Sequence, residues 1–375
     1  MNVRKRRILI DLRHLEYAYN GFGQLCLNYG NYFKNNADKI QDLDITLFVP
    51  KEYVGAFGDK VGYLEYKRSY KWYPFLYPHF DIWHATTQQA KYISLDSNTV
   101  RIVSVHDLNF LYERKAKRAQ HKLKRQQAIL DIADVITAIS NFTINELKTN
   151  INLKGKTVLL NYVGERSIAN DEMQMPSFVN TDRRFFFTIG QVLEKKNFHV
   201  LLDMMKLMPS YDLYICGDNR FEYAKQIEQR IADEGISNVK VTGIISAPEK
   251  VWMYKNCYGF MFPSKFEGFG YPVIEAMLFG KPVFSSSCTS LPEIGSKYAF
   301  FWKNFESEHM RDIVEENIDG FYNNEKLQEE QLGYANSFTL ERHMETYLDL
   351  YRTTPLKKGI NPWKVIYNYY KYIKS

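Results

Sequence analysis

Cysteine is scarce in this chain, whose 375 residues include only Cys26, Cys216, Cys257 and Cys288. The four are far apart in the sequence, and no two of them form a Cys-x-x-Cys pair. Disulfide frameworks and structural zinc sites both rely on groups of cysteines at characteristic spacings. The sequence therefore argues against either kind of site and predicts four reduced thiols in a cytoplasmic protein.

Long apolar segments are also missing. No stretch approaches the ~18 consecutive apolar residues of a membrane-spanning helix. Near the N-terminus only three apolar residues, Ile8 to Ile10, follow the basic segment, which is too short for the core of a signal peptide. The apolar content of 45% is still high enough for packed cores and excludes a largely disordered chain.

Acidic residues are absent from one strongly basic segment, Arg114 to Arg125, although the net charge of the chain is only +6. The C-terminal tail, Leu356 to Ser375, combines five lysines with Trp363 and several tyrosines. Each segment is either a solvated or core-packed helix or a contact with an anionic membrane surface, where basic residues bind favourably. We expect no nucleic-acid partner, because no recognised nucleic-acid-binding motif accompanies the charge.

Short apolar runs alternate with helical patterns along the whole chain, which indicates parallel α/β sheets. Residues 164–184 lack apolar periodicity and form the best linker. The pattern predicts an acceptor domain at 1–170, a nucleotide-sugar domain at 180–340 and C-terminal helices at 341–375 that cross back to the first domain. The strands are expected at 8–10, 45–49, 82–84, 102–105, 135–139, 158–160, 185–189, 213–216, 239–241, 259–262 and 283–285.

The most informative stretch is Pro263 to Glu275, which follows an apolar run typical of a buried strand. Gly268 and Gly270 form a loop in which the backbone can approach a ligand, and Pro272 suits the first position of a helix. A helix N-terminus after a glycine loop binds anions, and the carboxylates of Glu267 and Glu275 can accept hydrogen bonds from sugar hydroxyls. The pattern therefore favours a ligand that carries both phosphate and sugar.

This stretch, with Gly280-Lys281-Pro282-Val283 and Ser290-Leu291-Pro292-Glu293 after it, closely resembles the signature of retaining glycosyltransferases of family four. The resemblance includes bacterial surface-polysaccharide and lipopolysaccharide mannosyltransferases. It implies the GT-B fold, with two facing doubly wound Rossmann-like domains and a cleft between them. It further implies that Glu275 binds the donor ribose and Glu267 faces the donor sugar. The backbone N–H groups of Gly268, Phe269, Gly270 and Tyr271 would receive sugar hydroxyls or phosphate.

Another set of donor-site residues follows the strand at 185–189. In the family a glycine stands here, with a basic residue six positions on, and Gly190 and Lys196 match this pattern. Lys196 is expected to bind the diphosphate, as a compact cationic partner. Many relatives have arginine where this chain has Gln191, so Lys195 is a candidate substitute for the missing charge. Ile244, after the strand at 239–241, is expected near the nucleotide base.

In the first half, Gly21 and Gly23 resemble the family's N-terminal loop, which approaches the donor phosphates and the acceptor. The Gly-x-Gly pair fails the dinucleotide-binding fingerprint, because Cys26 stands where its third glycine belongs. His106, at the end of the strand at 102–105, resembles a histidine near the reacting sugar that donates to its hydroxyls or helps to position charge. The segment 83–86 is a weaker candidate for acceptor contact.

These residues predict a retaining glycosyltransferase that moves a hexose from a nucleotide-sugar donor, GDP-mannose or a UDP-hexose, to a glycan or lipid-linked acceptor. We expect the reaction at the cytoplasmic side of the membrane, with His106, Glu267 and Lys196 as the catalytic residues. No metal or other cofactor is expected, because Asp42-Leu43-Asp44 precedes a strand and so lies at the end of the sheet away from the site. The alternatives are a non-catalytic sugar-nucleotide-binding subunit, a GT-B epimerase or a phosphorylase.

Overall fold

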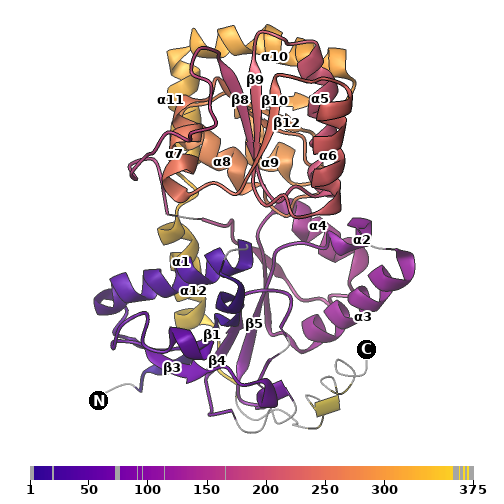
Figure 1. Cartoon of the computed structure of the whole chain (residues 1–375). Helices are drawn as coiled ribbons and strands as arrows, with labels where there is room; N and C mark the ends of the chain where they lie inside the picture. Colours follow the sequence, from indigo (N-terminus) through magenta and orange to yellow (C-terminus); the bar gives the residue numbers. More distant parts are fainter. Residues whose placement is uncertain are drawn as a thin grey trace. The chain divides into compact units, whose positions relative to one another are not determined.

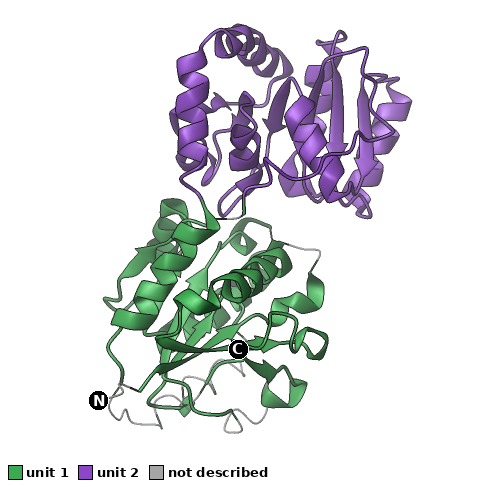
Figure 2. Cartoon of the chain, turned by 90° about the vertical axis from the view of Figure 1, so that its left-hand side faces the viewer, with its two compact units in different colours: residues 1–166, 339–375 green, residues 167–338 purple. Residues whose placement is uncertain are grey.

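The computed structural model describes residues 4–18, 21–71, 77–90, 92–94, 96–113, 115–164, 166–357, 363, 366–367 and 370. The chain divides into two compact units (Figure 2). Unit 1 comprises residues 1–166 and 339–375, and unit 2 comprises residues 167–338. The sequence prediction placed the corresponding boundaries at residues 170, 180 and 340.

Unit 1 is built on a parallel sheet of seven strands in the order β3-β2-β1-β4-β5-β6-β7. The central strands are apolar runs whose residues are almost all buried, as a parallel sheet covered on both faces requires. The order reverses between β1 and β4, which creates a topological switch point at the carboxyl ends of these strands. The strands are β1 (Arg6–Asp11), β2 (Leu43–Val49), β3 (Gly62–Glu65), β4 (Ile82–Ala85), β5 (Val100–Val105), β6 (Val135–Ala138) and β7 (Val158–Leu160).

Helices cover both faces of this sheet (Figure 1). Trp83 and Val103 point toward α3 and α4, where they join Ile129 and Leu147 in one apolar core. Alternate strand residues face the opposite way, toward α1 and α12. The helices of unit 1 are α1 (Gly21–Asn36), α2 (Phe110–Glu113), α3 (Ala116–Ile132), α4 (Asn141–Asn150) and α12 (Leu340–Thr353).

The sheet face under α12 carries polar side chains, and tyrosine hydroxyls of this helix form hydrogen bonds with them. His84 Nδ1 lies 2.6 Å from Tyr351 Oη, and His84 Nε2 lies 2.8 Å from Ser104 Oγ. Tyr347 Oη lies 2.6 Å from the same serine oxygen and 3.0 Å from Thr137 Oγ1. Because buried polar groups are costly unless they are hydrogen-bonded, this network specifies how α12 docks on the sheet.

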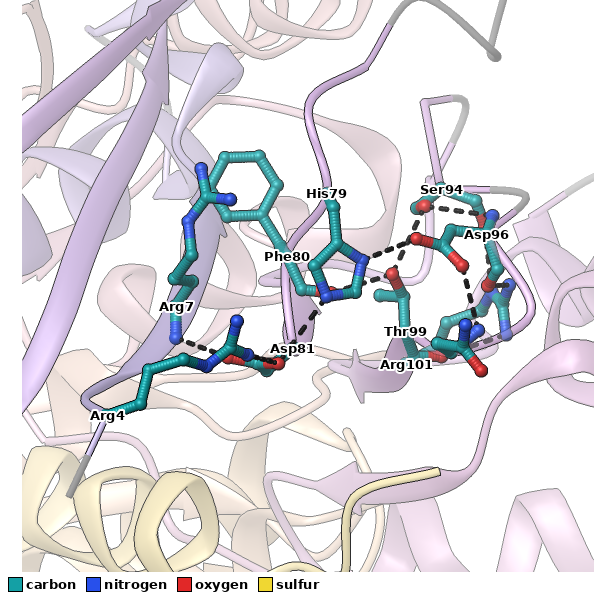
Figure 3. A network of polar contacts seen from close by, with 10 residues as sticks. Arg4, Arg7, His79, Phe80, Asp81, Ser94, Asp96, Thr99 and Arg101 are labelled. Atoms are coloured by element: carbon teal, nitrogen blue, oxygen red, sulfur yellow. Dashed lines mark hydrogen bonds and ion pairs between the residues drawn. The ribbon is translucent and has the colours of Figure 1, made fainter. Parts of the chain in front are cut away.

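A second polar network ties together the segments that precede β4 and β5, at the amino ends of the strands (Figure 3). His79 Nδ1 lies 2.5 Å from Asp96 Oδ2, and His79 Nε2 lies 3.5 Å from Asp81 Oδ1. The buried Arg101 guanidinium donates to three backbone carbonyls within residues 94–99. These contacts stabilise the amino ends of the strands, whereas the switch point lies at their carboxyl ends.

Unit 2 repeats the same topology with six parallel strands in the order β10-β9-β8-β11-β12-β13. Its switch point lies between β8 and β11, because the strand order reverses there. Phenylalanines fill these strands, and Phe186 and Phe187 are both fully buried on opposite faces. The strands are β8 (Phe185–Ile189), β9 (Asp212–Cys216), β10 (Val239–Gly243), β11 (Gly259–Phe262), β12 (Val283–Ser286) and β13 (Phe300–Trp302).

Each face of this second sheet also has its own helices (Figure 1). Phe186 belongs to an apolar core with residues of α5, α6 and α10. On the other face Tyr254 of α7 packs edge-on against Phe187, with ring centres 5.0 Å apart. The helices of unit 2 are α5 (His199–Lys206), α6 (Glu222–Asp233), α7 (Ala247–Asn256), α8 (Tyr271–Leu278), α9 (Leu291–Gly295), α10 (Ser307–Tyr322) and α11 (Glu325–Ala335).

The predicted α/β architecture is confirmed, and every expected strand is present with small shifts at its ends. The sequence missed β3 and β13, which are short edge strands of their sheets. The four cysteines are unpaired, as predicted. Within the described part of the chain, no helix is both long enough and apolar enough to span a bilayer.

Candidate active site

Most candidate residues of each unit follow strands at or next to its switch point, where ligands of doubly wound sheets bind. In unit 2, Gly190 follows β8 and Glu267 follows β11, the two strands that flank the reversal. In unit 1, Gly21 begins the helix after β1, and His106 directly follows β5. Each unit therefore carries its share of the predicted site.

The centre of the unit 2 site is an ion pair between Lys196 and Glu267. Lys196 Nζ lies 2.5 Å from Glu267 Oε1, and both side chains are largely shielded, with 12% and 14% exposed. The same carboxylate oxygen accepts a hydrogen bond from Ser264 Oγ at 2.7 Å. The ammonium also lies 4.8 Å from the centre of the Phe262 ring. A Cβ added to Gly190 would come within 3.2 Å of Lys196 Cε, so the glycine leaves room for this side chain.

This pairing fixes the charge of Glu267. Burial, the largest single effect, would raise the pKa of its carboxyl group, but Lys196, Lys195 and Ser264 together hold the pKa below its ordinary value. Glu267 is therefore a carboxylate at neutral pH, which suits it to accept hydrogen bonds or stabilise positive charge and not to act as a general acid.

The loop after β11 is fastened to the segment that precedes α9. The backbone N–H of Glu267 donates to Thr289 Oγ1 at 3.1 Å. Ser290 Oγ donates to the carbonyl oxygens of Glu267 and Phe269, at 3.1 and 2.9 Å. The loop backbone is thereby held in one conformation, which a site built from backbone N–H groups needs.

The conformation at the end of this loop requires glycine at position 270. Gly270 has a φ of 99°, and a Cβ added to it would come within 2.4 Å of Leu291 Cδ2. Only glycine fits both the left-handed conformation and the space, and α8 begins at the next residue, Tyr271. The Phe269 side chain is buried against Phe338, so only its backbone is placed to meet a ligand.

Glu275 lies one turn into α8, and two residues of α7 hold it. Tyr254 Oη donates to Glu275 Oε2 at 2.8 Å, and Lys250 Nζ forms an ion pair with Glu275 Oε1. The Glu275 side chain is only 6% exposed, and that of Lys250 is 29% exposed. Lys250 and Tyr254 were not among the residues predicted from the sequence. The available signal was their spacing of four residues on a helix that follows a predicted strand.

The remaining predicted donor-site residues of unit 2 are Gln191, Lys195 and Ile244. Gln191 is exposed, and its carbonyl oxygen accepts a hydrogen bond from the Leu193 N–H at 2.8 Å. Lys195 is half-buried, and its carbonyl oxygen holds the backbone of Lys265 at 2.8 Å. Ile244 follows β10 and is 72% exposed, which is unusual for so apolar a side chain.

In unit 1, one ring nitrogen of His106 is committed to the backbone. Its Nε2 lies 2.9 Å from the carbonyl oxygen of Thr86, which can only accept, so Nε2 carries the hydrogen. Burial lowers the pKa of His106 to about 4, although the Thr86 carbonyl acts in the opposite direction. The imidazole is therefore neutral at pH 7 and presents Nδ1 as an acceptor. The expectation that it donates to a sugar hydroxyl does not fit this geometry.

The glycines near the start of α1 differ in their surroundings. A Cβ added to Gly23 would come within 2.2 Å of the Tyr17 carbonyl oxygen, so this glycine permits close packing of the chain on itself. Gly21 has no atom within 4 Å of an added Cβ and is exposed. Between them, Phe22 packs edge-on against His106, with ring centres 5.1 Å apart.

Phe22 also borders a pocket of about 360 Å³ in unit 1. The buried Arg13 guanidinium pairs with Asp11 at 2.9 Å in the wall of this pocket, and His14 Nε2 lies 3.1 Å from Thr87 Oγ1. Polar and aromatic side chains line it: Arg13, His14, Glu16, Tyr17, Phe22, Tyr66, Arg68, Gln89 and Tyr92. The pocket suits a small polar ligand such as a sugar.

Two other predicted features have structural roles. His84, part of the proposed acceptor segment, is fully buried and both of its ring nitrogens are hydrogen-bonded, so it is unable to contact an acceptor. Asp42 pairs with Arg352 of α12, with oxygen–nitrogen distances of 2.7 and 3.0 Å. Among the described residues, no cluster of three or more His, Cys, Asp or Glu side chains is arranged to hold a metal ion.

Comparison with known proteins relates the chain to glycosyltransferases. Residues 170–336 match the family described as "Glycosyl transferases group 1". The O-antigen chain mannosyltransferase C of Escherichia coli is 23% identical over 295 residues, which are 75% of this chain and 74% of that protein. O-antigen chain mannosyltransferase B of the same organism is 26% identical over 52% of this chain and 54% of its own length. The chain thus spans about half of the second relative.

Solved structures share the fold over nearly the whole chain. Sucrose-phosphate synthase from Thermosynechococcus elongatus superposes with a TM-score of 0.72 at 15% identity, covering 93% of this chain and 98% of that one. HepE from Anabaena, in complex with UDP and glucose, superposes with a TM-score of 0.70 at 16% identity, covering 92% and 99%. The chain therefore carries a glycosyltransferase group 1 domain and has the GT-B fold of this group.

Proposed function

We propose that this protein is a retaining hexosyltransferase that moves mannose from GDP-mannose to a growing glycan or lipid-linked glycan, without a metal ion. The observation that carries this proposal is the shielded Lys196–Glu267 pair beside Gly190, with Glu275 one turn into the next helix. The relatives named as O-antigen mannosyltransferases favour mannose as the transferred sugar. A UDP-hexose is the alternative donor, because a solved structure of the same fold contains UDP and glucose.

The chemical problem is to stabilise a departing diphosphate and a positively charged, oxocarbenium-like sugar. Lys196 and the N-terminus of α8 supply positive charge and N–H donors for the diphosphate. Glu267, held ionised by Lys196, supplies a carboxylate for the sugar. The acceptor hydroxyl would attack from the face that the diphosphate leaves, and a phosphate oxygen would take its proton. No separate general base is then needed.

The polar pocket of unit 1 is the proposed site for the terminal sugar of the acceptor. Its volume of about 360 Å³ falls within the range of small-molecule sites. Phe22 offers an apolar ring face, and Arg13, His14 and Gln89 line the pocket with hydrogen-bonding groups. His106, adjacent to Phe22, would accept a hydrogen bond from a hydroxyl through Nδ1.

A lipid-linked acceptor would lie at a membrane surface, so we also propose a peripheral contact with the inner face of an anionic membrane. Helix α3 supports this idea because it exposes Lys117, Arg118, His121 and Lys124 and has no acidic residue in its first turns. Its opposite face, with Ala119 and Ile129, is buried within unit 1. Opposite charge draws such a basic face to anionic lipid headgroups.

The test is transfer by purified protein from a panel of nucleotide sugars to a mannose-terminated acceptor, with product anomers read by NMR. We expect GDP-mannose to be used with retention, equally well with and without excess EDTA. Lys196→Met should reduce turnover by roughly 10²-fold or more, as for loss of a transition-state contact. The exposed Lys255 supplies the matched control, Lys255→Met, which should change little. Inversion, a metal requirement, or donor binding without transfer would contradict the proposal.

A further inference from the structure

Helix α7 presents two residues to the carboxylate of Glu275 in a fixed arrangement. Ser246 caps this helix, its side chain accepting from the Glu249 N–H while Glu249 bonds back to the Ser246 N–H at 2.7 Å. The start of the helix is thereby set, and Lys250 and Tyr254 lie four residues apart on one side of it. Glu275 therefore receives both of its protein partners from a single rigid element.

The two partners bind different oxygens of the carboxylate. Lys250 Nζ pairs with Oε1, and Tyr254 Oη donates to Oε2 at 2.8 Å. An ionised carboxylate has about four acceptor positions, so each oxygen keeps capacity for one more hydrogen bond. Two further donors spaced like the vicinal hydroxyls of a ribose would complete the set.

Tyr254 is itself held firmly. Its ring is fully buried and stacks on Phe279, with centres 5.6 Å apart, and it meets Phe187 and Phe260 edge-on or tilted. A donor on so rigid a ring fixes the rotation of the carboxylate and not merely its charge. Lys250, which is more exposed, supplies the charge that compensates the buried Glu275.

We propose that Lys250 and Tyr254 are positioning residues that hold Glu275 in the orientation that reads the 2′ and 3′ hydroxyls of the donor ribose. The inference rests on the proposed donor site and adds to it the source of selectivity for ribonucleotides. Without Tyr254 Oη the carboxylate can rotate, and without Lys250 its charge lacks a partner. In either case the two remaining acceptor positions no longer match a vicinal diol.

The experiment measures the dissociation constants of GDP and of 2′,3′-dideoxy-GDP by calorimetry, with the UDP pair as a second series. The proteins are the wild type, Glu275→Gln, Tyr254→Phe, Lys250→Met and Lys250→Arg, with Lys255→Met of the same helix as the control. Lys255 is exposed and lies one residue from the C-terminal end of α7. Melting temperatures identify any variant that fails to fold, and Tyr254→Phe preserves the packing of the ring.

We expect the wild type to prefer the ribonucleotide by roughly 10-fold or more, the effect of losing a charge-assisted hydrogen bond. Glu275→Gln, Tyr254→Phe and Lys250→Met should each lose most of this preference, whereas Lys250→Arg and Lys255→Met keep it. The kcat with saturating donor should change much less than KM in Tyr254→Phe and Lys250→Met.

Two different failures are distinguishable. If Glu275→Gln keeps the full preference for ribose, the donor site itself is misassigned, and the proposed function loses its support along with the inference. If Glu275→Gln loses the preference but Tyr254→Phe and Lys250→Met retain it, the donor site stands and the positioning role of α7 is overturned.

Discussion

His106 donates one ring N–H to the Thr86 carbonyl, and this bond decides what the imidazole can offer a ligand. We predict that His106→Ala leaves nucleotide affinity within a few-fold but lowers kcat by roughly 10²-fold, as for loss of a transition-state contact. Because burial places the pKa of His106 at about 4, protonation of this residue should not reduce activity between pH 6 and 8. Initial rates across this range, with GDP affinities of both proteins, provide the measurement.

Two results would contradict the proposed role of His106. Near-normal kcat in His106→Ala would show that the imidazole only braces the loop through Thr86. A loss of wild-type activity near pH 6.5 that disappears in His106→Gln would show that the ring titrates near its ordinary value, contrary to the effect of its burial.

At the residue scale, the sequence predicts candidate site residues where a motif places several of them close together. Lys196, Glu267 and Glu275 were singled out from spacing and resemblance, and the structure brings Lys196 and Glu267 together. Lys250 and Tyr254 were not predicted, because their partner Glu275 lies on another helix and no local sequence pattern indicates a contact between helices. The tautomer of His106 was likewise hidden, since it depends on a carbonyl 20 residues away in the chain.

At the scale of elements, α12 is attached to the sheet of unit 1 by buried histidines that must stay neutral. Burial lowers the pKa of His84 to about 3 and that of His343 to about 4. The unfolded chain therefore binds more protons than the folded one below pH ~6.5, the usual histidine pKa, and stability falls as pH decreases through this region. Above pH ~6.5 these groups are neutral in both states, and their contribution no longer changes.

We predict that His84→Gln, which keeps a polar group at this position, weakens the dependence of stability on pH. Removing one such histidine should lower the slope of unfolding free energy by up to ~1.4 kcal/mol per pH unit between pH 6 and 5. Chemical denaturation at several pH values measures the slope, and His121→Gln, at an exposed position of α3, is the control. An unchanged slope in His84→Gln would mean that His84 becomes protonated without loosening α12.

The elements that the sequence missed are those with the weakest local signals. Strand β3 has only four residues and begins with glycine, and β13 has only three. Both are edge strands that pair with one neighbour only, and β13, although apolar (Phe300–Trp302), is shorter than a typical strand pattern. The expected linker at 164–184 largely packs on unit 2 through isolated contacts, such as Asn180 N–H to Tyr214 Oη at 2.8 Å, which leave no periodicity in the sequence.

At the scale of the whole molecule, its small net charge hides a strongly uneven distribution. Residues 116–125 of the basic segment lie in α3 and Lys115 is its N-cap residue, whereas Arg114 lies outside the described residues. On a helix, Ile366, Tyr369, Tyr370 and Ile373 of the C-terminal tail would share one face, and of these Tyr369 and Ile373 lie outside the described residues. Ile366 and Tyr370 are 44% and 54% exposed, so these two side chains are not core. Trp363, at 74% exposure, and Tyr367, at 57%, are also exposed.

Exposed aromatic and basic side chains in one unit are the combination that binds membrane interfaces. We predict that replacing Lys117, Arg118 and Lys124 by glutamine weakens binding to vesicles that contain phosphatidylglycerol. At roughly 1 kcal/mol for each basic residue near the surface, the loss should reach about 100-fold at low salt and shrink as salt increases. Co-sedimentation with anionic and with zwitterionic vesicles measures it.

The matched control removes the same charge from unit 2, by replacing the exposed Lys255, Lys303 and Lys326 with glutamine. If net charge alone drives binding, both triple variants lose it equally, and α3 is no specific contact. Deleting residues 356–375 separates the role of the tail from that of α3. If the tail is an anchor, its deletion should lower vesicle binding even at high salt, where apolar contacts persist and ionic ones are screened. A deletion that lowers the melting temperature but leaves vesicle binding intact would assign the tail to the fold of unit 1, and the membrane contact would then rest on α3 alone.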